Sequence, residues 1–161
     1  MAYTLDDVLE GLRGSRTFFL RHLDELRDEQ WDWKPYPECK SIRETLAHMI
    51  GNDAAALQSL QTGKAPDYDA ILTGAAQDAS DDYRRLRARL EESFNRLCDF
   101  IQSTYAGAPL DTEVCIYGSM MKLGRGVAYL SSEDYYHAGQ VGFIRIATDP
   151  TWDYYGFIYG G

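Results

Sequence analysis

The sequence predicts an all-α protein that folds as a four-helix bundle. Four stretches place apolar residues at intervals of three and four, the period of an amphipathic α-helix. Two of the connections between these stretches are long. Amphipathic helices bury their apolar faces against one another, so this pattern implies a helical bundle. The core between facing helices is a natural place for inward-pointing ligands.

The first helix is predicted over residues 4–26. Thr4 and Asp7 form a start that resembles a capping box, and apolar residues follow at helical spacing. Residues 28–40 contain two tryptophans and two prolines. Because proline lacks the N–H that a helix needs, this segment is predicted to be a connection held in place by its aromatic residues.

The second helix is predicted to begin after Ser41 and to run to about residue 61. Ser41 and Glu44 match the capping box well, and apolar residues again follow at intervals of three and four. Glu44 is therefore interpreted as a capping residue rather than a metal ligand. Residues 62–77 contain two glycines and a proline, which favours a loop with room for a short helical turn.

The third helix is predicted over residues 80–105, where one apolar stripe runs among charged neighbours. Residues 106–126 are interrupted by a proline and four glycines and are predicted to form an ordered loop or a small hairpin. The fourth helix is predicted over residues 127–147. The tail from residue 149 onward is too aromatic for a free end, so we expect it to pack back on the body.

Length and charge restrict the class of protein. A chain of 161 residues, 45% hydrophobic and 25% charged, suits one globular domain over residues 1–161. Its formal charge of −9 disfavours nucleic-acid and anionic-membrane partners. No apolar run approaches the roughly 18 residues that span a bilayer, and the N-terminus lacks the features of a signal peptide. The expected location is the cytoplasm.

The three cysteines do not form a recognisable disulfide or zinc motif. They include no CxxC pair and are odd in number, which favours reduced thiols. Cys98 lies on a predicted helix and is interpreted as a small core residue. Cys39 and Cys115 lie in loop-like sequence, so they remain candidates for reactive thiols.

Two stretches repeat one spacing, a glutamate four residues before a histidine. These are Glu44 with His48 and Glu133 with His137, and they use two of the three histidines of the chain. Side chains at i and i+4 lie on one face of a helix, so either pair can offer two ligands to a common point. The same spacing also forms ordinary surface ion pairs. The third histidine, His22, lies in a charged stretch and is predicted to face solvent.

His48, Glu133 and His137 together form a candidate metal site. His48 reaches the other two if the second and fourth helices are neighbours. Two imidazoles and one carboxylate leave coordination positions open, as catalytic sites require, and suit zinc, iron(II), nickel or manganese. A di-iron site of the ferritin kind is excluded because the chain has no E-x-x-H motif.

Several motifs, taken in their order and spacing, resemble the DinB and YfiT-like superfamily of small bacterial four-helix proteins. The resemblance covers nearly the whole chain, and it rests on Trp31-Asp32-Trp33-Lys34-Pro35, on Ser41 to His48, on Asp134 to Val141 with Arg145, and on Trp152-Asp153-Tyr154-Tyr155.

The resemblance implies an up-down-down-up bundle and one divalent metal held by three histidines. His48 and His137 match two of them, and Glu133 stands where the family has the third. Two possibilities follow: Glu133 completes a site of two histidines and one carboxylate, or the site is degraded and binds metal weakly. The first is favoured because glutamate at the same helical offset keeps the reach and the lone pairs.

The resemblance also implies a function. Characterised relatives include transferases and isomerases that use bacillithiol, mycothiol or glutathione, with the metal activating the low-molecular-weight thiol. The leading hypothesis is therefore a metal-dependent thiol S-transferase or a related enzyme that acts on a small-molecule substrate. Candidates for supporting the ligands or positioning the substrate are Asp53, Tyr136, Gln140 and Arg145.

Two alternatives remain open. One is a non-catalytic stress-response protein that binds a metal or a small ligand, and the other is a metal-dependent hydrolase that uses the same residues. A homodimer is expected from the family resemblance and from the many aromatic residues, twelve of them tyrosines, that can form an interface.

Overall fold

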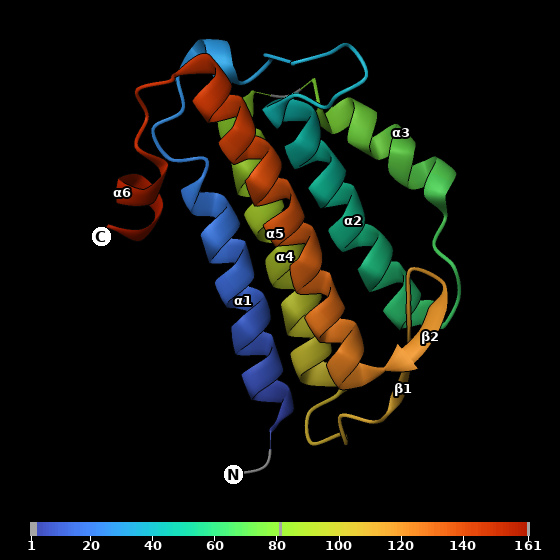
Figure 1. The fold of residues 1–161 in the computed structure, drawn as a ribbon. Helices are drawn as coiled ribbons and strands as arrows, with labels where there is room; N and C mark the ends of the chain where they lie inside the picture. The colour runs from blue at the N-terminus through green and yellow to red at the C-terminus, as the bar shows by residue number, and fades with distance from the viewer. Residues whose placement is uncertain (1–2, 81, 161) are drawn as a thin grey trace.

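The protein is mostly helical and carries one small sheet (Figure 1). The computed structural model describes residues 3–80 and 82–160. The predicted helical fold is confirmed in this coarse form, although the all-α class omits the sheet. In chain order the elements are α1 (Leu5–Arg21), a 3₁₀ turn (Asp28–Gln30), α2 (Ile42–Thr62), α3 (Tyr68–Asp78), α4 (Tyr83–Thr104), β1 (Glu113–Ile116), β2 (Ser119–Lys122), α5 (Leu123–Thr148) and α6 (Tyr154–Tyr159).

The four long helices, α1, α2, α4 and α5, lie side by side (Figure 1). α1 packs mainly against α5, and α2 packs mainly against α4. In Figure 1, α1 and α5 run upward whereas α2 and α4 run downward, and α3 lies against the outer side of α2. Within the described residues, no helix combines the length and the apolar character that crossing a membrane requires.

Both predicted capping boxes are present. The Thr4 hydroxyl accepts from the backbone N–H of Asp7, whose carboxylate accepts from the Thr4 N–H, and Ser41 and Glu44 do the same for α2. The predicted end of the first helix is wrong, because α1 stops at Arg21. Apolar spacing continues past this point because Leu23 is still buried, but it reaches the core from a turn.

The loop predicted over residues 62–77 is also wrong, because most of it forms α3. Asp67 caps this helix by accepting from the N–H of Ala70, and its own N–H donates to the side chain of Gln58 on α2. Gly63 and Pro66 precede this helix, whereas Gly74 lies within it, where a glycine is tolerated at a cost of about 1 kcal/mol relative to alanine. The glycines and the proline therefore led to the prediction of a loop where a short helix forms, and this helix packs against α2.

The hairpin before α5 is confirmed. β1 pairs with β2 in antiparallel register, and the two turn residues, Tyr117 and Gly118, have φ values of 51° and 82°. Tight hairpins require this left-handed conformation, which glycine adopts without strain. α5 begins at Leu123, four residues before the predicted start. Gly126 lies in the first turn of α5. A Cβ at this position would come within 2.6 Å of the Ile116 side chain, so glycine allows the helix to pack closely against β1.

The core has two apolar halves. The lower half gathers side chains from the first part of α1, the ends of α2 and α4, and the start of α5. The upper half gathers side chains from the end of α1, the starts of α2 and α4, and the second half of α5. A layer of buried polar residues lies between the two apolar halves. It is formed by residues on α1, α2 and α5, which are Ser15, Arg16, Asp53 and Asp134.

Arg16 joins three helices through this polar layer. Its two terminal nitrogens donate to both carboxylate oxygens of Asp53 on α2 at 2.9 and 3.0 Å, and its Nε donates to Asp134 on α5 at 2.7 Å. The Ser15 hydroxyl donates to the other carboxylate oxygen of Asp134, and the Ser93 hydroxyl on α4 donates to Asp53. Although burial opposes the charge, the two carboxylates raise the pKa of Arg16.

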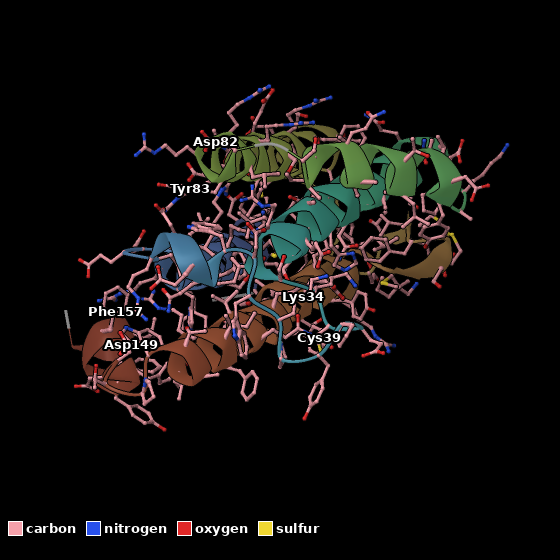
Figure 2. All side chains as sticks on the ribbon, turned by 90° about the horizontal axis from the view of Figure 1, so that it is seen from above. Lys34, Cys39, Asp82, Tyr83, Asp149 and Phe157 are labelled. Carbon is pink, nitrogen blue, oxygen red and sulfur yellow. The ribbon has the colours of Figure 1, made fainter. Side chains whose placement is uncertain are left out.

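The aromatic tail packs back on the body, as expected. The guanidinium of Arg145 lies 4.1 Å from the Trp152 ring centroid and 4.7 Å from that of Phe157, which is labelled in Figure 2. Arg145 also donates to the backbone carbonyls of His22 and Asp24. One buried cation therefore ties the tail and the turn after α1 to α5.

We expect Arg16→Met to lower the free energy of unfolding by about 3–5 kcal/mol, because it leaves two buried carboxylates without their cation. The matched control is Arg13→Met, one turn away on the exposed side of α1, which should have little effect. Urea unfolding measures both. Equal losses in the two variants would contradict the role of Arg16.

Candidate metal centre

His48, Glu133 and His137 meet between α2 and α5. Each offers one ligand atom, and these atoms all lie within 4.8 Å of one another. Oε2 of Glu133 is 3.7 Å from Nε2 of His137, and the two imidazole centroids are 5.1 Å apart. The helical spacing places Glu133 and His137 on one face of α5, and the pairing of α5 with α2 adds His48.

His137 is held so that one of its nitrogens faces this cluster. Its Nδ1 lies 2.7 Å from Oε1 of Gln140, and an amide oxygen only accepts, so the proton of the neutral ring belongs on Nδ1. The lone pair is then on Nε2, which is buried and has no hydrogen-bond partner within residues 3–80 and 82–160. A buried acceptor without a partner is costly, and a cation beside Glu133 would satisfy it.

Asn52 completes the contact between the two helices. It follows His48 by one turn of α2, and its Nδ2 donates to Oε2 of Glu133 at 2.9 Å. The same Nδ2 is 3.3 Å from Nε2 of His48. Sequence analysis missed Asn52, although its spacing of four from His48 places it on the ligand-bearing face.

Both imidazoles of the cluster favour the neutral form. Burial lowers the pKa of His48, and the nearby His137 and Lys40 lower it further, against the opposing effect of Glu133. Burial also lowers the pKa of His137, although its hydrogen bond with Gln140 acts in the other direction. Metals bind neutral imidazole, so these surroundings prepare both rings as ligands.

A cavity of about 850 Å³ opens on the histidine side of the cluster. His48 and His137 line it, together with the connection that precedes α2, on which Figure 2 labels Lys34 and Cys39. Its volume falls within the range of small-molecule sites. The other lining residues include one of each charge, Glu38 and Lys40, and the aromatic or apolar side chains of Tyr36, Tyr136, Phe143 and Ile144.

The four predicted supporting residues divide into two pairs. Gln140 supports His137, and the exposed Tyr136 lies with its ring centroid 5.0 Å from that of His137 and lines the cavity. Asp53 pairs instead with Arg16, and Arg145 binds the turn after α1 and the tail. Both are buried charges with structural partners of their own, and their role in supporting the ligands or positioning a substrate stays a prediction.

The burial of His22 and of the three cysteines tests four further predictions. His22 was predicted to face solvent but is fully buried, with Nδ1 bonded to the carbonyl of Phe18. Cys115 was a candidate reactive thiol but is buried on β1. Cys98 is a core residue, as predicted, and burial raises its pKa to about 12. Cys39 is partly buried and lines the cavity, so it is the candidate thiol that can meet a ligand.

A family model described as the DinB superfamily matches residues 12–141, a stretch that contains all three candidate ligands. The chain belongs to the DinB superfamily. A comparison with curated proteins gives no match.

Solved structures of a mycothiol-dependent maleylpyruvate isomerase resemble this DinB protein. One has 20% sequence identity and a TM-score of 0.70, and a histidine-to-alanine mutant of that enzyme has 21% identity and a TM-score of 0.69. Each comparison covers 87% of this chain but only 61% of the neighbour. The chain thus spans less than two thirds of the length of these neighbours, and the likeness establishes a shared fold.

We expect Gln140→Leu to weaken zinc binding by about 10- to 100-fold, because the His137 ring loses the acceptor that fixes its orientation. A chelator-competition titration measures the change. The matched control is Gln102→Leu on α4, whose side chain bonds to Asp6 away from the cluster. An unchanged zinc affinity in Gln140→Leu would contradict this role.

We expect the metal-free protein to lose stability as the pH falls below about 6.5. His22, His48 and His137 have an ordinary pKa of 6.5, and burial lowers it in the folded protein. The unfolded chain therefore binds more protons in this range. For each histidine, protonation of the unfolded chain lowers the free energy of unfolding by up to about 1.4 kcal/mol for every unit by which folding lowers the pKa of that histidine.

Urea unfolding at pH 7.5 and 5.5 checks this pH dependence, with His48→Gln as a variant in which one contributing group is absent. The variant should show a smaller change than the parent. Stability that rises toward pH 5.5 would contradict the expected direction.

Proposed function

We propose that this protein binds one divalent metal through His48, Glu133 and His137 and acts as a thiol-dependent S-transferase or a related enzyme. The observation that carries the proposal is the buried Nε2 of His137, which has no hydrogen-bond partner among the described residues and lies beside a carboxylate and a second imidazole that borders an 850 Å³ cavity. The donor set fits zinc, nickel, iron(II) or manganese.

The bound metal would supply a positive charge that stabilises a thiolate, the nucleophilic form of a small thiol. The residues of the chain prepare the site for this chemistry. Gln140 keeps the proton of His137 on Nδ1, and Glu133 adds one negative charge to two neutral rings. The cavity borders both imidazoles, and its aromatic residues Tyr36, Tyr136 and Phe143 are exposed, so they would contact a bound thiol or substrate from the cavity walls.

The cavity also suits an electrophilic small-molecule substrate beside the thiol. Its volume of about 850 Å³ is larger than a single small thiol requires. Phe143 and Ile144 offer apolar contact, and Lys40 places a positive charge close enough to lower the pKa of both histidines. The mycothiol dependence of the structural neighbours supports a thiol as the second component.

The wider proposal is a cytoplasmic homodimer, each subunit one DinB-type bundle with up-down-down-up helices. The helix directions in Figure 1 support the bundle type. Exposed apolar residues on α5 support a subunit interface, and they include Tyr129, Tyr135, Phe143 and Ile146. Such residues are enriched where protein surfaces associate.

The experiment that tests the function combines metal loading with a thiol screen. Metal-free protein is reconstituted with zinc, nickel, iron(II) or manganese and offered mycothiol, bacillithiol or glutathione with a series of small electrophiles. We expect thiol consumption only with metal present, and we expect His137→Ala to lose both the metal and the activity.

The control for this experiment is Glu10→Gln, an exposed carboxylate on α1 that should retain both properties. Equal metal content in wild type and His137→Ala would overturn the metal centre. Metal uptake without consumption of any thiol would contradict the transferase and favour a non-catalytic binding protein. Metal-dependent hydrolysis without thiol would favour the hydrolase.

A further inference from the structure

Asn52 stands between two of the three candidate ligands. Its Nδ2 is 2.9 Å from Oε2 of Glu133 and 3.3 Å from Nε2 of His48. These are two of the atoms that a cation in this cluster would contact. The side chain of Asn52 therefore occupies the point where α2 and α5 present their donors to each other.

The Nδ2 of Asn52 points toward ligand atoms of the cluster. The two N–H groups of the amide can donate to Glu133 and to the lone pair of His48. A bound cation takes up those lone pairs, and its charge repels N–H dipoles that point toward it. A half turn about the terminal bond of Asn52, which has a broad and roughly two-fold preference, exchanges the nitrogen for the carbonyl oxygen.

We propose that Asn52 is a fourth protein ligand, which binds the metal through its side-chain oxygen. This inference rests on the proposed metal centre and adds to it a residue that the DinB resemblance does not supply. His48 and Asn52 are separated by one turn of α2, and Glu133 and His137 by one turn of α5. Each helix then contributes two donors to one point.

The surroundings of Asn52 favour this assignment. The two histidines line the large cavity, whereas Asn52 and Glu133 line a separate small cavity that also touches Arg16. The small cavity has a volume of about 10 Å³, about one water-sized probe. Asn52 would hold the metal from the side of the small cavity, whereas His48 and His137 border the large cavity, in which a thiol and a substrate could bind.

The fourth ligand also affects which metal binds. A neutral carbonyl oxygen adds no charge to the site, and oxygen donors suit manganese better than a third imidazole does. The site with Asn52 then has two nitrogen and two oxygen donors from the protein. We therefore expect a smaller preference for zinc over manganese than a site of three histidines would have.

Cobalt(II) titrations of Asn52→Leu and Asn52→Asp distinguish a ligand from a hydrogen-bond donor. Leucine removes both functions, whereas aspartate keeps an oxygen at the same reach but loses both N–H donors. We expect the cobalt affinity to fall about tenfold or more in Asn52→Leu and to stay within about threefold of wild type, or to increase, in Asn52→Asp. The visible spectrum of bound cobalt should change in the leucine variant.

The controls are Asn95→Leu and Asn95→Asp, which alter an exposed asparagine on α4. Thermal melting of each metal-free variant checks that it folds. An equal loss of affinity in Asn52→Leu and Asn52→Asp would show that Asn52 only orients Glu133, and an unchanged affinity in Asn52→Leu would remove it from the site. Either result overturns the inference.

The same titration separates this inference from the proposed function. Cobalt binding by wild type and its loss in His137→Ala support the metal centre whatever Asn52 does. If wild type and His137→Ala bind cobalt equally, the metal centre falls and the assignment of Asn52 falls with it.

Discussion

The pairing of Arg16 with Asp53 and Asp134 is the interaction on which the arrangement of the helices depends. One guanidinium from α1 binds a carboxylate on α2 and another on α5, so the two helices are held at one separation and one height. Asp53 is the residue after Asn52, and Asp134 is the residue after Glu133. The contacts that join the helices therefore also determine where the candidate metal ligands meet.

The polar layer gives the bundle a defined register more than it gives it stability. Buried ion pairs lose most of their mutual attraction to the cost of desolvation, and apolar residues of the same volume often stabilise as well. However, a shift of α5 along α2 by one turn, about 5.4 Å, would separate Asp134 from Arg16 and leave charges unpaired in the core. The same shift would separate His48 from Glu133 and His137. Both arguments favour a single alignment, with the apolar halves packed on either side of the layer.

The geometry of the candidate metal centre follows from the same arrangement and from local contacts. Burial lowers the pKa of both imidazoles and so favours their neutral form, Gln140 orients one of them, and Asn52 lies between the other and Glu133. The result is three possible ligand atoms within 4.8 Å of one another, and the two imidazoles that carry two of them border a cavity. The connection before α2 forms one wall of this cavity and brings Cys39 and Lys40 to it.

The sequence by itself determined the features that depend on neighbours along the chain. The capping boxes at Thr4 and Ser41, the shared face of Glu133 and His137, and the hairpin before α5 follow from helix period and turn chemistry, which act over a few residues. Only the tertiary structure decided the burial of His22, the formation of α3, and the use of Asp53 by Arg16 and of Asn52 by Glu133. Those outcomes depend on which helix faces which, and a polar side chain acquires its partner only when packing brings a distant segment within hydrogen-bond range.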